Sequence, residues 1–554
     1  MEKPWVKHYD PGVPEHLNYP DQPLFGFLEQ SARRFPERAC TIFNDRVISY
    51  QQMEQLSNRL ARQLVNLGVC KGERVGLCMP NIPQFVLAFY GILKAGGVVA
   101  ALNPLYKQAE MSFQLADAGV KTVLCHSAAL PVLREVEAAG LIHRRIVTQV
   151  EDADLLAGAG EELIENHQPA QLVGEIGLLE LLQQAGEEDT SPAVPVQPGD
   201  PAVFQYSGGT TGIPKGAIGL HRNLTANSVQ FRTWLAGREG CETILTVIPL
   251  YHVYGMVIAM SMGVSLGARL VLCMDPRNLT DVLEKIDRYQ PSIFPGVPGL
   301  YHAINQHPEV KAGRYDLHSI RACISGSAPL LQEVKDTFEA LTGGKLVEGY
   351  GLSEAPTATH CNPIQGENRN GSIGLPLPDV EARIVDLETG QTELPVGEAG
   401  ELIVRGPQVM AGYHQHPEED ALSLRQGWLY TGDVARMDAA GYFYLVDRKK
   451  EVIKAGGIQV WPREVEEVIS RHPAVLEAGV AGVIRPGRGE TVKAWVVLKP
   501  GAACSQMEIQ DWCDEHLARY KSPAEVEFIG KLPRTGVGKL LRRELIRLDR
   551  EAHQ

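Results

Sequence analysis

The spacing of apolar residues predicts alternating helices and strands in the first part of the chain. Residues 50–68, YQQMEQLSNRLARQLVNLG, carry apolar side chains at helical spacing and end at a glycine, which is typical of an amphipathic helix. The apolar runs 74–79 and 98–103 are predicted to be buried strands, and residues 85–97 between them a helix. Strand, helix and strand joined by short links favour right-handed βαβ units, so we expect a parallel sheet.

The same alternation returns further along the chain. Four more apolar runs are predicted to be buried strands: 243–250, 268–273, 291–297 and 320–326. The helical pattern LTDVLEKIDRY (279–289) lies between two of these runs. Residues 150–200 are acidic and loosely patterned, and we expect a surface excursion there.

After about residue 375 the pattern changes to short strands separated by turn residues, which predicts a small antiparallel β subdomain. The predicted strands are 381–386, 400–406 and 441–447. The last hundred residues then carry two helical patterns and two strand patterns, at 462–472, 507–518, 478–484 and 493–498. The predicted fold class is α/β: a large N-terminal domain, 1–446, of parallel-type sheets with helices plus the β subdomain, and a small α+β C-terminal domain, 447–554. We place the boundary at Asp447-Arg448, just after the strand YFYLV.

Length, charge and cysteine usage narrow the class of protein. A chain of 554 residues is too long for one hydrophobic core, so at least two domains are expected. The net charge of −14 argues against nucleic acid as a partner. The N-terminus shows no apolar signal-peptide region and the chain has no run of about 18 apolar residues, so neither export nor a membrane span is expected. The ten scattered cysteines form no CxxC pair, which favours free thiols in the cytoplasm over a zinc site.

The stretch YSGGTTGIPKG (206–216) is too rich in glycine to be a helix or strand interior. It follows the strand-like AVFQY, and a glycine-rich turn after a strand can direct several backbone N–H groups at an anion. Three hydroxyls and Lys215 add further donors, so the stretch predicts a phosphate cradle that closes on phosphates and opens again. It is not a Walker A loop, because Pro214 precedes the lysine and Gly216 follows it. The alternative interpretation is a flexible surface loop.

Several further motifs, taken together with the predicted phosphate cradle, show a resemblance to a known family. After YSGGTTGIPKG come VIPLYHVYG (247–255), GYGLSE (349–354), YTGD (430–433), DRKKEVIKAGG (447–457) and PRTGVGKL (533–540). With these motifs in this order, the chain resembles the adenylate-forming superfamily of acyl-CoA synthetases, luciferases and peptide-synthetase adenylation domains over nearly its whole length. It is most similar to bacterial long-chain fatty-acid–CoA ligases.

The resemblance implies that ATP, Mg²⁺ and coenzyme A are used, and it assigns residues to the nucleotide. Catalysis is assigned to Lys539, Thr211, Glu354 and His252, and the metal to Glu354 and Ser207. In GYGLSE, Tyr350 offers a ring for adenine, and Ser353 a hydroxyl where the family more often has threonine. The full set expected to bind ATP or AMP is Ser207, Gly208, Gly209, Thr210, Thr211, Gly212, Lys215, Gly326, Ser327, Ala328, Glu348, Gly349, Tyr350, Gly351, Ser353, Asp433, Arg448, Lys450 and Lys539.

Each assignment has a chemical reason and a plainer alternative. Lys539 would stabilise the negative charge that develops when a carboxylate attacks the α-phosphate, although a terminal lysine is usually only solvent-exposed. Glu354 offers the hard oxygen that Mg²⁺ prefers. Asp433 matches the family's ribose-binding aspartate, and the plainer alternative is a turn residue. Ser327 would otherwise be a helix N-cap.

The resemblance also assigns the acyl pocket, the hinge and the coenzyme A site. The pocket is expected at His252, Tyr254, Gly255, Met256 and Gly326, and the alternative is ordinary core packing. Met256 stands where some relatives carry a gating tryptophan. The C-terminal domain is expected to be mobile about Asp447. Its movement would bring the expected coenzyme A residues into the site: Lys454, Gly456 and Gly457.

We therefore expect an AMP-forming long-chain fatty-acid–CoA ligase of the cytoplasm. Three relatives are disfavoured: amino-acid-activating enzymes, because VIPLYHVYG has no aspartate; luciferases, because their His-His-Gly-Phe pattern is absent; and enzymes that stop at acyl-AMP, because no insertion follows Asp447. An aryl- or medium-chain-acid CoA ligase of the coumarate type and a non-catalytic nucleotide-binding protein stay as alternatives. A homodimer and peripheral contact with the inner face of the membrane are left open.

Overall fold

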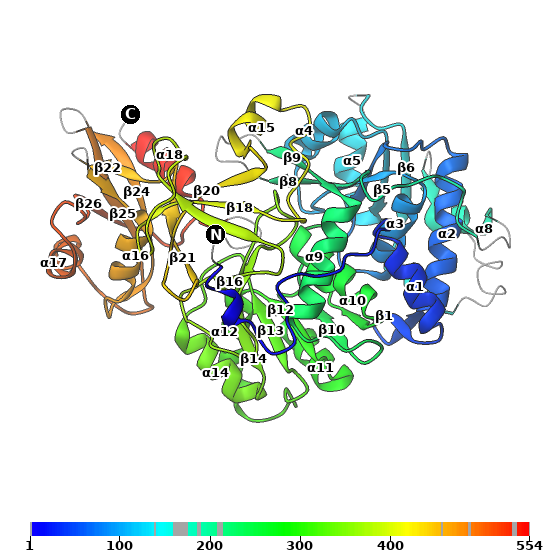
Figure 1. The fold of residues 1–554 in the computed structure, drawn as a ribbon, viewed down its shortest axis with the longest axis horizontal. Helices are drawn as coiled ribbons and strands as arrows, with labels where there is room; N and C mark the ends of the chain where they lie inside the picture. Colours follow the sequence, from blue (N-terminus) through cyan, green and yellow to red (C-terminus); the bar gives the residue numbers. More distant parts are fainter. Residues whose placement is uncertain are drawn as a thin grey trace. The chain divides into compact units, whose positions relative to one another are not determined.

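The computed structural model describes residues 3–137, 140–158, 175–185, 190–207, 214–455, 458–485, 489–534 and 540–552. The chain forms two compact units (Figure 1). The first contains residues 1–381 and 405–429, and the second contains residues 382–404 and 430–554.

The first unit contains a sheet of seven strands in which the predicted βαβ units are confirmed. Its order is β7 (Ile176–Gly177), β6 (Arg144–Thr148), β5 (Thr122–His126), β3 (Arg74–Cys78), β4 (Val98–Ala101), β8 (Pro201–Ser207) and β9 (Lys215–Leu220). Neighbouring strands are parallel except for β8 and β9, which pair antiparallel. The sheet therefore ends in a hairpin whose connection is the glycine-rich stretch.

A second sheet of nine strands completes the first unit. Its order is β16 (Leu375–Pro376), β15 (His360–Cys361), β14 (Lys345–Tyr350), β13 (Ala322–Ser325), β12 (Ile293–Gly296), β10 (Thr243–Thr246), β11 (Arg269–Leu272), β1 (Ala39–Phe43) and β2 (Arg46–Ser49). The four runs predicted as buried strands between residues 243 and 326 lie side by side here as parallel neighbours. In open α/β sheets ligands bind at the carboxyl ends of such strands.

Helices fill the space around both sheets. The helix α2 (Tyr50–Asn66) begins at Ser49 with a capping box and agrees with the predicted amphipathic helix. The helix α3 (Pro83–Lys94) is buried along its whole length and contacts β3 and β4 of one sheet and β1 of the other. A helix that is apolar all round is one buried on every side, so α3 joins the two sheets into one core.

The acidic stretch 150–200 is not simply a surface excursion, which corrects the prediction. Residues 159–174 and 186–189 lie outside the described residues. Between them β7 adds an edge strand to the seven-stranded sheet, and α8 (Leu178–Gln183) buries four leucines. A two-residue strand and a six-residue helix are too short to show a periodic pattern among acidic residues.

The second unit has the predicted antiparallel strands and the predicted α+β fold. The strands β17 (Glu381–Val385), β18 (Gly400–Arg405), β20 (Trp428–Met437) and β21 (Phe443–Arg448) belong to it for most of their length. The strands β24 (Val475–Arg485) and β25 (Gly489–Leu498) form a hairpin, and β26 (Glu525–Phe528) runs parallel to β25. The helices are α16 (Pro462–Ser470), α17 (Gln506–His516) and α18 (Arg542–Ala552).

The boundary predicted after the strand YFYLV falls inside β21. Val434 and Asp433 of β20 pair with Asp447 and Arg448, so the strand continues for two more residues. The compact units also group β18, β20 and β21 with the C-terminal residues. The domain ranges 1–446 and 447–554 and the hinge at Asp447 stay predictions.

Two findings concern the cysteines and the length of the helices. All ten cysteines are free thiols. Across the part of the chain that the structure describes, no helix combines the length and the apolar character needed to cross a membrane.

A buried histidine predicts how the stability of the first unit depends on pH. His221, which begins α9 (His221–Trp234), is 1% exposed, and its Nδ1 accepts a hydrogen bond from the backbone N–H of Leu24. Burial lowers the pKa of His221 to about 4, against about 6.5 in an unfolded chain. Between about pH 6.5 and pH 4 the histidine is therefore protonated in the unfolded chain but not in the folded one. Over this range the free energy of unfolding falls by roughly 1.4 kcal/mol for each unit by which the pH is lowered.

We expect His221→Gln, which can accept the same hydrogen bond but does not titrate, to remove this loss. Between pH 7.5 and 5.5 the free energy of unfolding of the wild type should fall by about 1.4 kcal/mol more than that of the variant. Urea denaturation at both pH values measures the difference. The exposed His318→Gln is the control and should follow the wild type. Parallel pH profiles for wild type and His221→Gln would show that His221 does not titrate as stated.

Candidate active site

The glycine-rich stretch connects two paired strands, as expected of a loop that follows a buried strand. Ser207 at the end of β8 pairs with Lys215 at the start of β9. Because a strand follows the loop, the helix that a Walker A motif requires is absent from this place. Residues 208–213, which include the predicted Gly208, Gly209, Thr210, Thr211 and Gly212, lie outside the described residues, as does the side chain of Ser207.

Among the predicted binding residues of this motif, Lys215 is the one whose side chain is described. It is 7% exposed, and its Nζ lies 2.5 Å from Oε1 of Glu419. The same ammonium lies 5.8 Å from the centre of the Tyr413 ring. Lys215 is therefore held in a fixed place at the end of the loop, rather than extending into solvent.

The segment 410–414 holds this side of the site together. Its backbone pairs with β9: the N–H of His414 donates to Gly216 O at 2.8 Å, and the N–H of Ile218 donates to Gly412 O at 2.9 Å. At its other end the N–H of Met410 donates to Glu354 O at 2.9 Å. The segment thus connects β9 with the turn that follows β14.

Tyr413, at the centre of this segment, was missed in the sequence analysis. Its hydroxyl donates to Oε1 of Glu354 at 2.9 Å while its ring faces Lys215. Burial and the nearby Glu354 carboxylate raise the pKa of Tyr413, so its hydroxyl stays protonated as a donor. A single tyrosine 59 residues from its partner leaves no pattern in the sequence, and only the fold brings the two together.

The predicted Glu348, Gly349 and Tyr350 end β14, and the turn that follows carries the predicted Gly351, Ser353 and Glu354. Tyr350 is 8% exposed, and its ring lies edge-on to His360 at 5.9 Å. Gly351 has no room for a side chain, because a Cβ there would lie 1.7 Å from Thr357 O. The turn therefore depends on glycine, and it brings Glu354 within reach of Tyr413.

Glu354 fits the role of a magnesium ligand. Its half-buried carboxylate is a hard oxygen donor, and a hydrogen bond from a neutral hydroxyl leaves its negative charge in place. No group of three or more His, Cys, Asp or Glu side chains is arranged to hold a metal within the described ranges. A site with one carboxylate matches the way Mg²⁺ is usually held, by few carboxylates together with phosphates.

The small-residue turn after β13 has a different conformation from a helix N-cap. Ser327 is exposed and has φ of +71°, and the next helix, α14 (Gln332–Thr342), begins after Leu331. The alternative interpretation of Ser327 as an N-cap is therefore wrong. Gly326 is buried beside the ring of Tyr254, whose hydroxyl donates to Ile324 O at 2.7 Å. Tyr254 thus connects this turn to the segment that carries His252.

His252 precedes a π-helix, η3 (Tyr254–Ser261), a form of helix frequent at functional sites. Its Nδ1 accepts from the N–H of Tyr254 at 3.2 Å, so the neutral ring carries its proton on Nε2. Burial lowers the pKa of His252 to about 4, which keeps it neutral at pH 7. A Cβ on Gly255 would lie 2.4 Å from Pro249 O, and Met256 is fully buried. These two residues are packed as core, and their place in an acyl pocket stays a prediction.

In the second unit, the two residues predicted to bind ribose lie side by side. Asp433 of β20 and Arg448 of β21 are paired in register, and Arg448 Nε lies 2.7 Å from Oδ1 of Asp433. The ion pair holds the Asp433 carboxylate in one orientation, as recognition of two neighbouring hydroxyls requires. The plainer alternative of a lone turn residue does not apply to Asp433, because it lies within a strand.

The predicted hinge is fixed by hydrogen bonds inside the second unit. The Asp447 carboxylate accepts from the N–H groups of Arg448 at 2.7 Å and Arg463 at 2.8 Å, and burial raises the pKa of Asp447. Lys450 and Lys454 are exposed, as expected for residues that meet a polyanion. Gly456, Gly457 and Lys539 lie outside the described residues.

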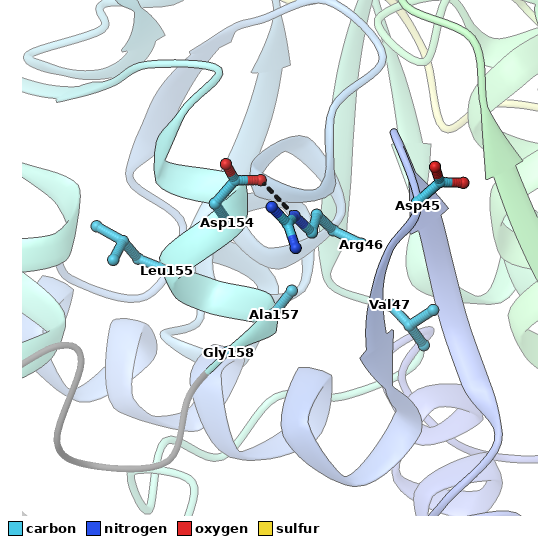
Figure 2. A pocket seen from close by; sticks show the side chains of 7 residues that line it. All are labelled: Asp45, Arg46, Val47, Asp154, Leu155, Ala157 and Gly158. Atoms are coloured by element: carbon cyan, nitrogen blue, oxygen red, sulfur yellow. Dashed lines mark hydrogen bonds and ion pairs between the residues drawn. The ribbon is translucent and has the colours of Figure 1, made fainter.

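A pocket on the first unit contains none of the predicted residues (Figure 2). It is lined by Asp45, Arg46, Val47, Asp154, Leu155, Ala157 and Gly158. Arg46 Nε donates to Oδ1 of Asp154 at 2.8 Å, and Asp45 is paired with Arg288. Its charged groups therefore compensate one another, and the pocket lies apart from the chemistry described above.

Comparison with known proteins shows the family of this chain. The AMP-binding enzyme family matches residues 28–414, and the AMP-binding enzyme C-terminal domain matches residues 464–539. A long-chain-fatty-acid–CoA ligase of Bacillus subtilis (strain 168) is 41% identical over 563 residues, covering 100% of this chain and 99% of the relative. A 4-coumarate–CoA ligase of Pinus taeda is 31% identical over 547 residues, covering 96% and 95%.

A solved structure shows the same fold. The ATP-bound MatB of Rhodopseudomonas palustris superposes with a TM-score of 0.84 at 27% sequence identity, covering 97% of this chain and 100% of that chain. The chain belongs to the AMP-binding enzyme family, the adenylate-forming class that its motifs resemble.

The crowding at Gly351 predicts that the turn after β14 cannot accept even one methyl group. We expect Gly351→Ala to lower the free energy of unfolding by about 3 kcal/mol, because the new Cβ meets backbone atoms rather than a movable side chain. The matched control is Gly299→Ala in α12 (Pro298–Gln306), where a Cβ has open space. That change should cost nothing, since alanine is the better helix former. Equal urea midpoints for the two variants would contradict this account.

Proposed function

We propose that this protein joins a long-chain fatty acid to coenzyme A in two steps through an acyl-AMP intermediate. In the first step a carboxylate oxygen bonds to the α-phosphorus of ATP and the bond to pyrophosphate breaks. In the second step the coenzyme A thiol loses its proton and its sulfur bonds to the acyl carbon, and AMP leaves. The observation that carries the proposal is the 41% identity, along the whole chain, to the Bacillus subtilis long-chain ligase.

The residues of the first unit are assigned to ATP and the fatty acid. The 208–212 loop and Lys215 bind phosphate oxygens, with Thr211 as a hydroxyl donor, and Tyr350 and Gly326 to Ala328 flank the adenine. Glu354 would hold Mg²⁺, and Ser207 is assigned to the same ion. When bound, Mg²⁺ would neutralise part of the negative charge on the phosphates. Neutral His252 can donate from Nε2 to an oxygen of the acid, which orients the carboxylate for attack.

The residues of the second unit are assigned to the ribose, the transition state and coenzyme A. Asp433 accepts from the ribose hydroxyls, with Arg448 holding its carboxylate. Lys539 stabilises the charge on the α-phosphate as the acid attacks. Rotation about Asp447 would then exchange Lys539 for the face that carries Lys450, Lys454, Gly456 and Gly457. Two half-reactions that need different groups at one place give a physical reason for such a movement.

The coumarate-type alternative is less well supported than the long-chain acid. The Pinus taeda 4-coumarate ligase is 31% identical, ten percentage points below the Bacillus subtilis long-chain ligase. We place the reaction in the cytoplasm. Analytical sedimentation measures whether the protein forms a homodimer, and binding to lipid vesicles measures whether it contacts a membrane.

A panel of acids tests the proposed function. The protein is incubated with Mg-ATP, coenzyme A and acids running from acetate to oleate, together with coumarate and benzoate, and mass spectrometry detects acyl-AMP and acyl-CoA. We expect acyl-CoA from saturated and unsaturated long-chain acids. Aryl-CoA or short-chain products alone would favour the coumarate-type alternative, and ATP binding without any adenylate would favour a non-catalytic nucleotide-binding protein.

Lys539→Ala tests the assignment of the first half-reaction. We expect acyl-AMP formation to slow by roughly 10²–10³-fold, because a positive charge directed at the developing negative charge is lost. The control is Lys531→Ala, an exposed lysine a few residues earlier, which should react like the wild type. Single-turnover mixing with quenching measures the rate. A Lys539→Ala protein that forms acyl-AMP at the normal rate would remove Lys539 from the mechanism.

A further inference from the structure

Tyr413 lies between Glu354, which is assigned to Mg²⁺, and Lys215, which is assigned to the phosphates. Its hydroxyl donates to Oε1 of Glu354 at 2.9 Å, and its ring centre lies 5.8 Å from Nζ of Lys215. Glu354 follows β14, and Lys215 begins β9 of the other sheet. The Tyr413 side chain therefore contacts Lys215, on a strand of one sheet, and Glu354, in the turn after a strand of the other.

The backbone of Tyr413 is fixed on both sides. It forms a bridge with Ala217 of β9, and its N–H donates to Oδ1 of Asp420 at 2.7 Å. The preceding Gly412 has φ of +150°, and a Cβ there would meet the Asp420 carboxylate at 2.7 Å. A tyrosine held this firmly loses little further freedom when it orients a partner.

The hydroxyl of Tyr413 is suited to orient a metal ligand. Hydrogen bonds to charged groups are stronger than neutral ones, and groups that hold a metal-binding carboxylate affect affinity even though they do not touch the ion. A phenol hydroxyl donates this hydrogen bond without an ion pair, so it holds the Glu354 carboxylate in one direction and leaves it available to a metal ion.

The ring of Tyr413 has a separate effect on Lys215. An ammonium within about 6 Å of an aromatic centre is attracted by the face of the ring. Glu419 holds the same ammonium through an ion pair at 2.5 Å. Ring and carboxylate together define where the lysine at the end of the phosphate loop lies.

We propose that Tyr413 is a positioning residue that aligns Glu354 with Mg²⁺ and Lys215 with the phosphates of ATP. The inference rests on the proposed function for the role of Glu354. It goes beyond that function in naming the residue that couples the metal side of the site to the phosphate loop.

Two substitutions separate the two effects of Tyr413. Tyr413→Phe removes only the hydroxyl, so ATP binding in the presence of Mg²⁺ should weaken about tenfold while binding in EDTA stays within about twofold. Tyr413→Leu also removes the ring and should weaken binding in EDTA as well. Isothermal titration of ATP, without fatty acid or coenzyme A, measures both conditions.

The matched control is Tyr315→Phe, which removes the same kind of contact elsewhere in the first unit. The Tyr315 hydroxyl donates to Oε2 of Glu309 at 3.0 Å, and its loss should leave ATP binding unchanged with and without Mg²⁺. In turnover, Tyr413→Phe should need about tenfold more Mg²⁺ for half-maximal pyrophosphate release and reach a similar rate at saturation.

Two results would overturn the inference. One is a Tyr413→Phe protein that binds Mg-ATP as the wild type does. The other is equal weakening with and without Mg²⁺, which would mean that the hydroxyl acts only through the fold. A wild type that binds ATP but makes no acyl-CoA would contradict the proposed function alone, and the comparison of the Tyr413 variants would still stand.

Discussion

The pairing of segment 410–414 with β9 is the interaction on which the phosphate side of the site depends. Its backbone hydrogen bonds to Gly216, Ile218 and Glu354 connect a hairpin of the seven-stranded sheet to the turn after β14 of the nine-stranded sheet. The seven-stranded sheet alone could place only Lys215, and the nine-stranded sheet alone could place only Glu354. Because these backbone hydrogen bonds join both places, the start of β9, which carries Lys215, is held next to the turn that carries Glu354.

Charge compensation inside the chain is the second constraint. Lys215 is paired with Glu419, and Arg448 with Asp433; Lys215 and Asp433 are buried, and their partners are half-buried. Such pairs cost desolvation energy, and removal of one partner leaves a buried charge without compensation. They are therefore better explained as contacts that fix the direction of a side chain than as sources of stability, and the proposed binding of phosphate and ribose needs fixed directions.

The sequence predicted the elements with strong patterns and the motifs that lie within one segment. The parallel strands, the helix at 50–68 and the C-terminal α+β fold are confirmed, because the strands are continuous apolar runs between turns and the helix at 50–68 keeps its apolar spacing over several turns. The short β7 and α8 were missed because two to six residues show no period among acidic neighbours. Gly351 was predicted as a binding residue, but its crowding against Thr357 depends on a turn that only the fold defines. Tyr413 was missed because its partners are distant in the sequence, and Ser327 was misread as a possible cap because φ cannot be read from residue type.

The central claim is that an acid and ATP form an adenylate on this protein before coenzyme A takes part. Its most direct test is the exchange of labelled pyrophosphate into ATP, measured with palmitate and Mg²⁺ and without coenzyme A. The account predicts exchange that requires the acid, because acyl-AMP formation is reversible while both products stay available. Formation of acyl-CoA with no acid-dependent exchange under these conditions would contradict it, since the acid would then be activated by another route.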